Sequence, residues 1–124
     1  MTKRVLKAMD DPHMAIMGHP TGRLLLDREA YPIDMAKVIA RAGERGVAIE
    51  LNADPHRLDM GWELCHQAKQ AGVPVPIGAD AHSIAGLANV DLGIAMARKA
   101  GLEKDDVLNT RDVEGFLKHA RQRR

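Results

Sequence analysis

Three short apolar runs, separated by stretches of helical periodicity, constrain the fold of this chain more than any other feature. The runs cover residues 14–17, 47–51 and 73–79. Short, nearly continuous apolar runs are typical of parallel strands that are covered on both faces. Parallel strands need a crossover connection, which is usually a helix. The alternation therefore predicts an α/β fold with a small parallel sheet.

The stretches around these runs carry apolar residues at helical spacing. This periodicity predicts helices over residues 2–9, 34–45, 61–71, 88–100 and 110–120. Gly46, Gly72 and Gly101 are expected to end three of them, Asp59 is a candidate N-cap of the third, and Thr110 is expected to cap the last. Three strands are few for a closed barrel, so we expect either part of a larger fold or a sheet completed by another copy.

Composition limits the class of protein. The chain has 18 Lys plus Arg and 17 Asp plus Glu, and this balance argues against a broad electrostatic binder of nucleic acid. The single cysteine, Cys65, permits no internal disulfide and is expected to be buried and inert. No apolar stretch is long enough to cross a bilayer and no secretory leader is visible. We therefore expect a single domain over residues 1–124, cytoplasmic and without a membrane partner.

Polar residues gather just past the predicted strand ends. They are His19, Thr21 and Arg23 after the first strand, Asn52, Asp54, His56, Arg57 and Asp59 after the second, and Asp80, His82 and Ser83 after the third. In parallel α/β folds, functional sites form from the loops that leave the carboxyl ends of the strands. We therefore expect these side chains to share one rim of the sheet.

His19, Asp80 and His82 are the candidate metal ligands. Two imidazoles and a carboxylate suit Zn²⁺ or Mn²⁺ and leave positions open for water and phosphate. His19 alone would be more typical of a residue that caps the turn beginning at Pro20, but together with Asp80 and His82 it is favoured as a ligand. A metal held here would lower the pKa of its bound water and polarise a phosphoryl oxygen.

Four other residues are candidates for supporting roles. Arg23 and Arg57 are suited to hold phosphate oxygens through bidentate contacts, and surface ion pairs are the alternative. Asn52 is a candidate substrate contact, and it shares one side of its strand with Glu50 by period-two alternation. A glutamate that points inward from a buried strand needs a partner, so Glu50 is expected either to be structural or to support the metal ligands.

Four segments together resemble a known family: residues 19–25 (His-Pro-Thr-Gly-Arg-Leu-Leu), 50–52 (Glu-Leu-Asn), 55–59 (Pro-His-Arg-Leu-Asp) and 80–83 (Asp-Ala-His-Ser). They are similar to the polymerase and histidinol phosphatase (PHP) domain, most of all to the version at the C-terminal end of bacterial family X DNA polymerases. The resemblance implies part of a distorted, seven-stranded, TIM-like βα barrel with divalent metals at the strand ends. It also implies metal-dependent phosphodiester cleavage, usually 3′-to-5′ exonuclease trimming of DNA.

By the same resemblance, His19 matches a late histidine ligand of the family, and Asp80 and His82 match its closing Asp-x-His pair. Arg23 and Arg57 match basic groups near the metals. The early His-x-His pair of the family does not occur in these residues. The resemblance therefore implies the C-terminal half of a PHP domain, with the remainder of that domain, the polymerase domains and DNA as partners, and with weak or no activity alone.

Two alternatives stay open. The chain is also consistent with a non-catalytic α/β module whose uncovered sheet edge pairs with another copy to form a homo-oligomer. A phosphatase that acts on a small monoester such as histidinol phosphate would share the metal chemistry.

Overall fold

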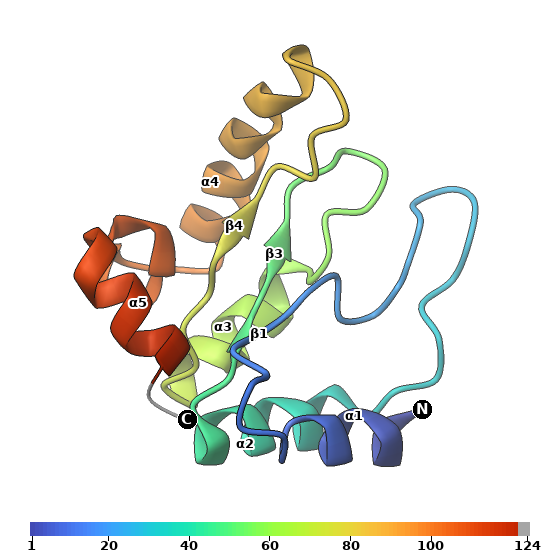
Figure 1. Ribbon diagram of the computed structural model, residues 1–124. Helices are drawn as coiled ribbons and strands as arrows, with labels where there is room; N and C mark the ends of the chain where they lie inside the picture. The colour runs from blue at the N-terminus through green and yellow to red at the C-terminus, as the bar shows by residue number, and fades with distance from the viewer. Residues whose placement is uncertain (122–124) are drawn as a thin grey trace.

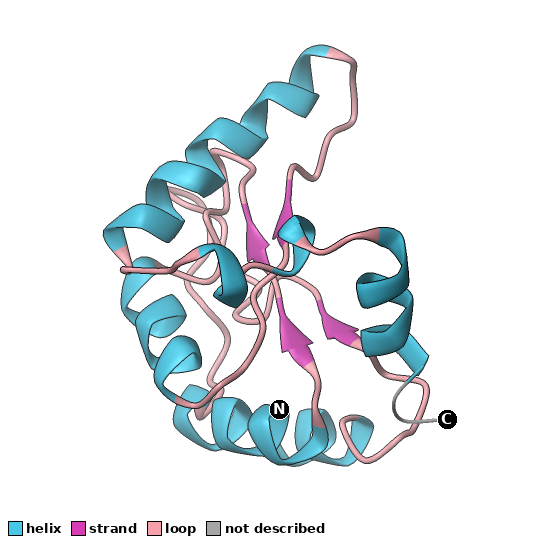
Figure 2. Ribbon diagram, turned by 90° about the vertical axis from the view of Figure 1, so that its left-hand side faces the viewer, coloured by secondary structure: helices cyan, strands magenta, loops and turns pink. Residues whose placement is uncertain are grey.

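Short parallel strands lie at the centre of the protein, and helices surround them in the computed structural model, which describes residues 1–121 (Figure 1, Figure 2). The strands are β1 (Ile16–Met17), β2 (Ala48–Ile49), β3 (Leu51–Asn52) and β4 (Ile77–Gly78). The α-helices are α1 (Thr2–Ala8), α2 (Met35–Arg45), α3 (Trp62–Gln70), α4 (Val90–Lys99) and α5 (Val113–Arg121). Three 3₁₀ turns complete the fold: η1 (Ala85–Asn89), η2 (Lys104–Asp106) and η3 (Leu108–Thr110). No helix within the described residues is both long and apolar enough to cross a membrane.

Residues 48–53 form the middle of the sheet. β2 pairs with β1 and β3 pairs with β4, both in parallel. Only Glu50 separates β2 from β3, and its N–H donates to the carbonyl of Met17 at 2.9 Å, while the N–H of Leu51 donates to the carbonyl of Pro76 at 2.8 Å. Successive residues of this middle segment thus donate alternately to the first apolar run on one side and to the third apolar run on the other. The three apolar runs are therefore arranged in parallel in this structure.

The regular strands are shorter than the apolar runs that predicted them, and the third run shows why. Pro76 accepts from Leu51 but has no N–H to return to the middle strand. Regular pairing of this run therefore begins only at Ile77.

The two edges of the sheet differ. Beyond the third run, Val75 forms a parallel bridge with Val107. The side chain of Asn109 then imitates a neighbouring strand, accepting from the N–H of Ile77 at 2.7 Å and donating to its carbonyl at 2.9 Å. On the opposite side, β1 pairs only with β2 within residues 1–121, and Ile16 is 38% exposed. One edge is therefore covered and the other is open.

The core lies between the sheet and the helices that cover it. α2 contributes Val38, Ile39 and Ala42, which are buried at helical spacing. α4 approaches the sheet closely because it carries Gly93, where a Cβ would lie 2.4 Å from Cγ2 of Ile77. The core is built mainly from Val, Ile, Leu, Ala and Met, in a chain that has only one Trp, one Tyr and one Phe.

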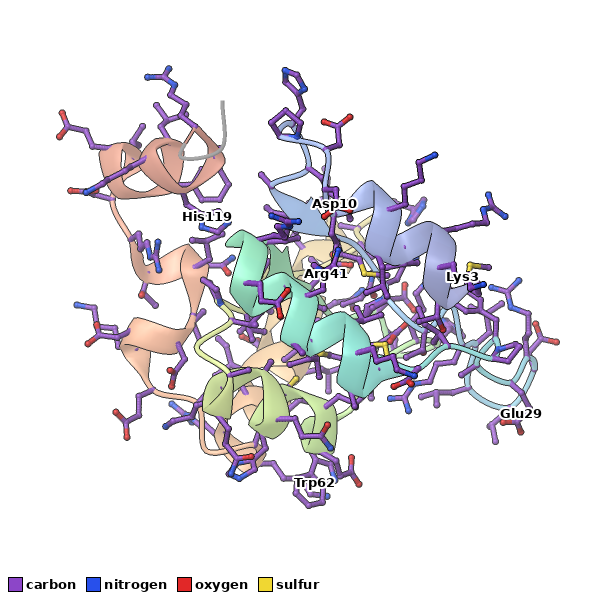
Figure 3. The ribbon with its side chains drawn as sticks, turned by 90° about the horizontal axis from the view of Figure 1, so that it is seen from below. Lys3, Asp10, Glu29, Arg41, Trp62 and His119 are labelled. Atoms are coloured by element: carbon purple, nitrogen blue, oxygen red, sulfur yellow. The ribbon has the colours of Figure 1, made fainter. Side chains whose placement is uncertain are left out.

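α1 and α2 pack together at the end of the molecule opposite to the strand carboxyl ends (Figure 1). Seen from below, Asp10 and Arg41 lie side by side (Figure 3), with Arg41 Nη1 3.0 Å from Asp10 Oδ1. Arg45 Nε reaches the same oxygen at 2.9 Å. These exposed ion pairs connect α2 to the residues that follow α1, far from the rim at the strand carboxyl ends.

Two predicted helix caps were wrong. α3 begins after Gly61, because the Asp59 side chain is engaged with a different loop. The last helix begins at Val113, where Asp112 Oδ1 accepts from the N–H of Gly115 at 2.7 Å. Thr110 instead donates its hydroxyl to the carbonyl of Lys104 at 2.6 Å. The α/β organisation agrees with the sequence, and membership of a larger βα barrel stays a prediction.

Candidate functional site

The turn after β1 is held by two carboxylates. On one side, the N–H of His19 donates to Glu50 Oε2 at 2.6 Å. On the other side, Asp59 accepts from the N–H of Thr21 (3.0 Å), from its hydroxyl (2.9 Å) and from the N–H of Gly22 (3.0 Å). The turn is therefore fixed by its own N–H groups, with His19 exposed at the rim.

Asp59 is completely buried, and the middle strand holds its backbone. Its N–H donates to the carbonyl of Asn52 at 3.1 Å, and its own carbonyl accepts from the N–H of Asn52 at 2.6 Å. No lysine or arginine of the described chain forms an ion pair with this carboxylate. Hydrogen-bond donors of the turn therefore stabilise the charge in place of a cation.

A second cluster joins the loops after β3 and β4. Asp80 Oδ2 accepts from Asn52 Nδ2 at 3.1 Å and lies 3.4 Å from Arg57 Nε. Arg57 Nη1 is buried and has no hydrogen-bond partner within residues 1–121. The backbone of Asp80 has a φ of 51°, in the left-handed region. Asp80 therefore directly contacts two other predicted site residues, Asn52 and Arg57.

The histidines of these loops bond locally. His82 Nδ1 lies 2.7 Å from the carbonyl of Asp80, and His56 Nδ1 lies 2.9 Å from Asp54 Oδ1. The backbone N–H of His56 is the largest of several interactions that lower the pKa of Asp54. Both imidazoles are exposed at the rim.

Arg23 holds two loops together. Its Nε donates to the carbonyl of Arg57 at 3.0 Å, and its Nη2 donates to the carbonyl of Leu58. Beside it, the N–H of Leu25 donates to the carbonyl of His56 at 2.6 Å. The guanidinium of Arg23 is therefore engaged mainly with backbone, in contrast to that of Arg57.

The structure brings together part of the predicted set. Asn52, Arg57 and Asp80 form one cluster, and Glu50 is bonded to His19. Within residues 1–121, no three His, Cys, Asp or Glu side chains lie in a group that could hold a metal ion. The imidazole and carboxylate donors suit Zn²⁺ or Mn²⁺ chemically, but in this arrangement they do not complete a site.

Sequence reasoning missed the function of Asp59. Asp59 is one of the polar residues after the second predicted strand and a candidate N-cap, but nothing in its spacing indicates that it accepts from Thr21 and Gly22. A buried carboxylate requires several donors, and the burial of Asp59 is seen only in the structure.

Comparison with known proteins gives the family context. No family model matches the chain. The chain is 43% identical over 119 residues to the DNA polymerase/3'-5' exonuclease PolX of Bacillus subtilis, which covers 94% of this chain and 21% of PolX. It is 30% identical over 129 residues to a probable phosphatase of Thermoanaerobacter sp. strain X514, covering 99% of this chain and 50% of that protein. A probable phosphatase of Caldanaerobacter subterraneus is 31% identical over 130 residues, with 98% and 49% covered.

Exonucleases and phosphatases both hydrolyse phosphate esters, so the chain is related to phosphoesterases. More particularly, the predicted resemblance to the PHP domain of bacterial family X DNA polymerases is confirmed. The chain spans about a fifth of the length of PolX and about half the length of the phosphatase relatives.

Proposed function

We propose that this chain is a phosphoesterase module, the 3′-5′ exonuclease (PHP) part of a family X type of DNA polymerase. The 43% identity to PolX over 94% of the chain is the observation that carries the proposal. The matched length includes most of the rim described above. DNA would be the substrate, and the remainder of the PHP domain and the polymerase domains would be the partners.

Arg57 is the better candidate of the two arginines for holding phosphate. Its Nη1 is buried without an acceptor in the part of the chain that the structure describes, whereas two carbonyls already engage Arg23. An unpaired buried guanidinium N–H is costly, and a shift of this side chain, which is 22% exposed, would let an anionic phosphate oxygen satisfy it with a charge-assisted hydrogen bond. Arg23 instead positions the loop that carries Arg57.

We also propose that the module uses divalent metal ions, Zn²⁺ or Mn²⁺, with His19, Asp80 and His82 as ligands. Such an ion would polarise a phosphoryl oxygen and supply a more acidic water. The described residues alone do not gather three such ligands. The proposal therefore requires further ligands from outside this chain, and we expect the isolated chain to be weakly active or inactive.

A chimera tests the proposal. This chain would replace the matched segment of B. subtilis PolX, and trimming of a 5′-labelled single strand would be followed with Mn²⁺ and with EDTA. We expect metal-dependent 3′-to-5′ trimming that falls at least tenfold in Asp80→Asn and His82→Ala. His13→Ala is the matched control, because His13 is exposed and bonds only locally to Asp11. A chimera that polymerises but does not trim, or that trims equally well as Asp80→Asn, would contradict the proposal.

The similarity to probable phosphatases favours a second candidate, hydrolysis of a small phosphate monoester. The same chimera, assayed on p-nitrophenyl phosphate and on the labelled strand, compares the two substrate classes. Faster metal-dependent turnover of the monoester than of DNA would favour the phosphatase.

A further inference from the structure

We infer that Glu50 is a positioning residue that sets the direction of His19, and that Gly78 makes room for it. The inference rests on the proposed function, because His19 is one of the proposed metal ligands. It is supported by the arrangement of the Glu50 carboxylate, the backbone N–H of His19 and the two glycines Gly18 and Gly78.

Among the described residues, the carboxylate of Glu50 has one hydrogen bond, the short one from the N–H of His19 at 2.6 Å. No lysine or arginine of residues 1–121 forms an ion pair with it. The sequence predicted that an inward-pointing Glu50 would need a partner, and within the described chain that partner is the main chain of the loop.

This hydrogen bond acts on a residue in an unfavourable conformation. His19 has a φ of 25°, a positive value that residues with a Cβ rarely adopt. Its carbonyl accepts from the N–H of Gly22 at 3.1 Å, which closes the turn. The Glu50 hydrogen bond therefore fixes the peptide plane at the point where the His19 side chain leaves the backbone.

Two glycines flank the carboxylate: Gly18, which directly follows β1, and Gly78, the last residue of β4. A Cβ at Gly78 would lie 2.3 Å from Glu50 Oε1, a distance that non-bonded atoms do not adopt, and 3.3 Å from its Cδ, a tight contact. A Cβ at Gly18 would lie 3.5 Å from Oε2, an ordinary contact. Only the glycine at 78 is therefore required by the position of Glu50.

This difference supplies a matched pair of variants. In Gly78→Ala the clashing atom is the end of a flexible side chain, so the carboxylate moves and the fold is kept. Gly18→Ala adds the same methyl group without displacing Glu50. Glu50→Ala removes the acceptor directly, and Glu50→Gln restores an acceptor oxygen.

The test follows His19 by NMR in the intact chain without added metal. We expect a downfield amide proton with slow hydrogen exchange in the wild type, in Gly18→Ala and in Glu50→Gln. In Glu50→Ala and Gly78→Ala, exchange of this amide should be at least tenfold faster. An unchanged His19 amide in both of these variants would overturn the inference.

A second measurement adds Mn²⁺ and follows broadening of the His19 imidazole signal. We expect the Mn²⁺ concentration for half-broadening to rise at least fivefold in Glu50→Ala and Gly78→Ala, but not in Gly18→Ala. Equal half-broadening concentrations in all variants would overturn the positioning function. If the wild-type imidazole is not broadened while the amide responds as expected, the positioning is supported and the proposed ligand function of His19 is rejected.

Discussion

Replacing Asp59 with alanine removes the carboxylate that accepts hydrogen bonds from one side of the turn after β1. Three donors depend on this carboxylate: the N–H groups of Thr21 and Gly22, and the hydroxyl of Thr21. Thr21 is buried as well, so water does not readily replace the lost oxygen atoms. The loss should therefore appear as a change in global stability.

The magnitude follows from the number of donors left unpaired. A buried donor without a partner costs about 1–3 kcal/mol, and two backbone N–H groups cannot rotate to find another acceptor. The Thr21 hydroxyl can rotate, so it adds little. We expect Asp59→Ala to lower the free energy of unfolding by about 3–5 kcal/mol, against a total of about 5–15 kcal/mol for a domain.

Urea unfolding followed by the fluorescence of Trp62, the single tryptophan, measures this loss. Thr21→Val removes only the hydroxyl contact and should cost about 1 kcal/mol. Asp27→Ala removes an exposed carboxylate and should change stability by less than about 0.5 kcal/mol. If Asp59→Ala is no less stable than Thr21→Val, the buried carboxylate does not hold the turn.

Three further predictions concern other parts of the molecule. Burial raises the pKa of Cys65 to about 12, so the unfolded chain loses this proton first as the pH rises above 9. Alkaline urea titrations should show stability falling by up to about 1.4 kcal/mol per pH unit there, and less steeply in Cys65→Ala. Asn109→Ala removes both side-chain hydrogen bonds to Ile77 and should cost about 2 kcal/mol in urea unfolding; a loss below 0.5 kcal/mol would refute the edge assignment. If the open edge of β1 pairs with another copy, sedimentation velocity should show an oligomer that Ile16→Lys dissociates, and a wild-type monomer at high concentration would exclude it.

The parallel sheet could be predicted because apolar runs and helical spacing report burial, which is a property of the whole element. The exact extent of the sheet could not be predicted, since it depends on single N–H donors. Pro76 shortens the third strand by the absence of one N–H. Asp112 caps the last helix in place of Thr110, whose hydroxyl bonds to a carbonyl that is distant from the helix start.

At the rim, too, some features could be predicted from the sequence and others could not. The strand-end rule correctly placed Asn52, Arg57 and Asp80 in one neighbourhood. It could not predict which donors a carboxylate would select, because that depends on local backbone geometry. Asp80 adopts a positive φ, and its side chain contacts Asn52 and Arg57.

The carboxylates and imidazoles of the rim have different functions in this structure. Glu50 and Asp59 are bonded to N–H groups of one turn, and Asp80 is bonded to two side chains of its own rim. By contrast, the imidazoles of His19 and His82 are exposed. The acidic groups thus shape the loops while the histidines face outward. Both contacts are to Asp80 Oδ2, so a metal at this oxygen would compete with Arg57 and Asn52, and phosphate that satisfied Arg57 would weaken the competition. For a metal at Oδ2, substrate and metal would then favour each other's binding, because phosphate would draw Arg57 away from the carboxylate and the metal would release Arg57 to the phosphate.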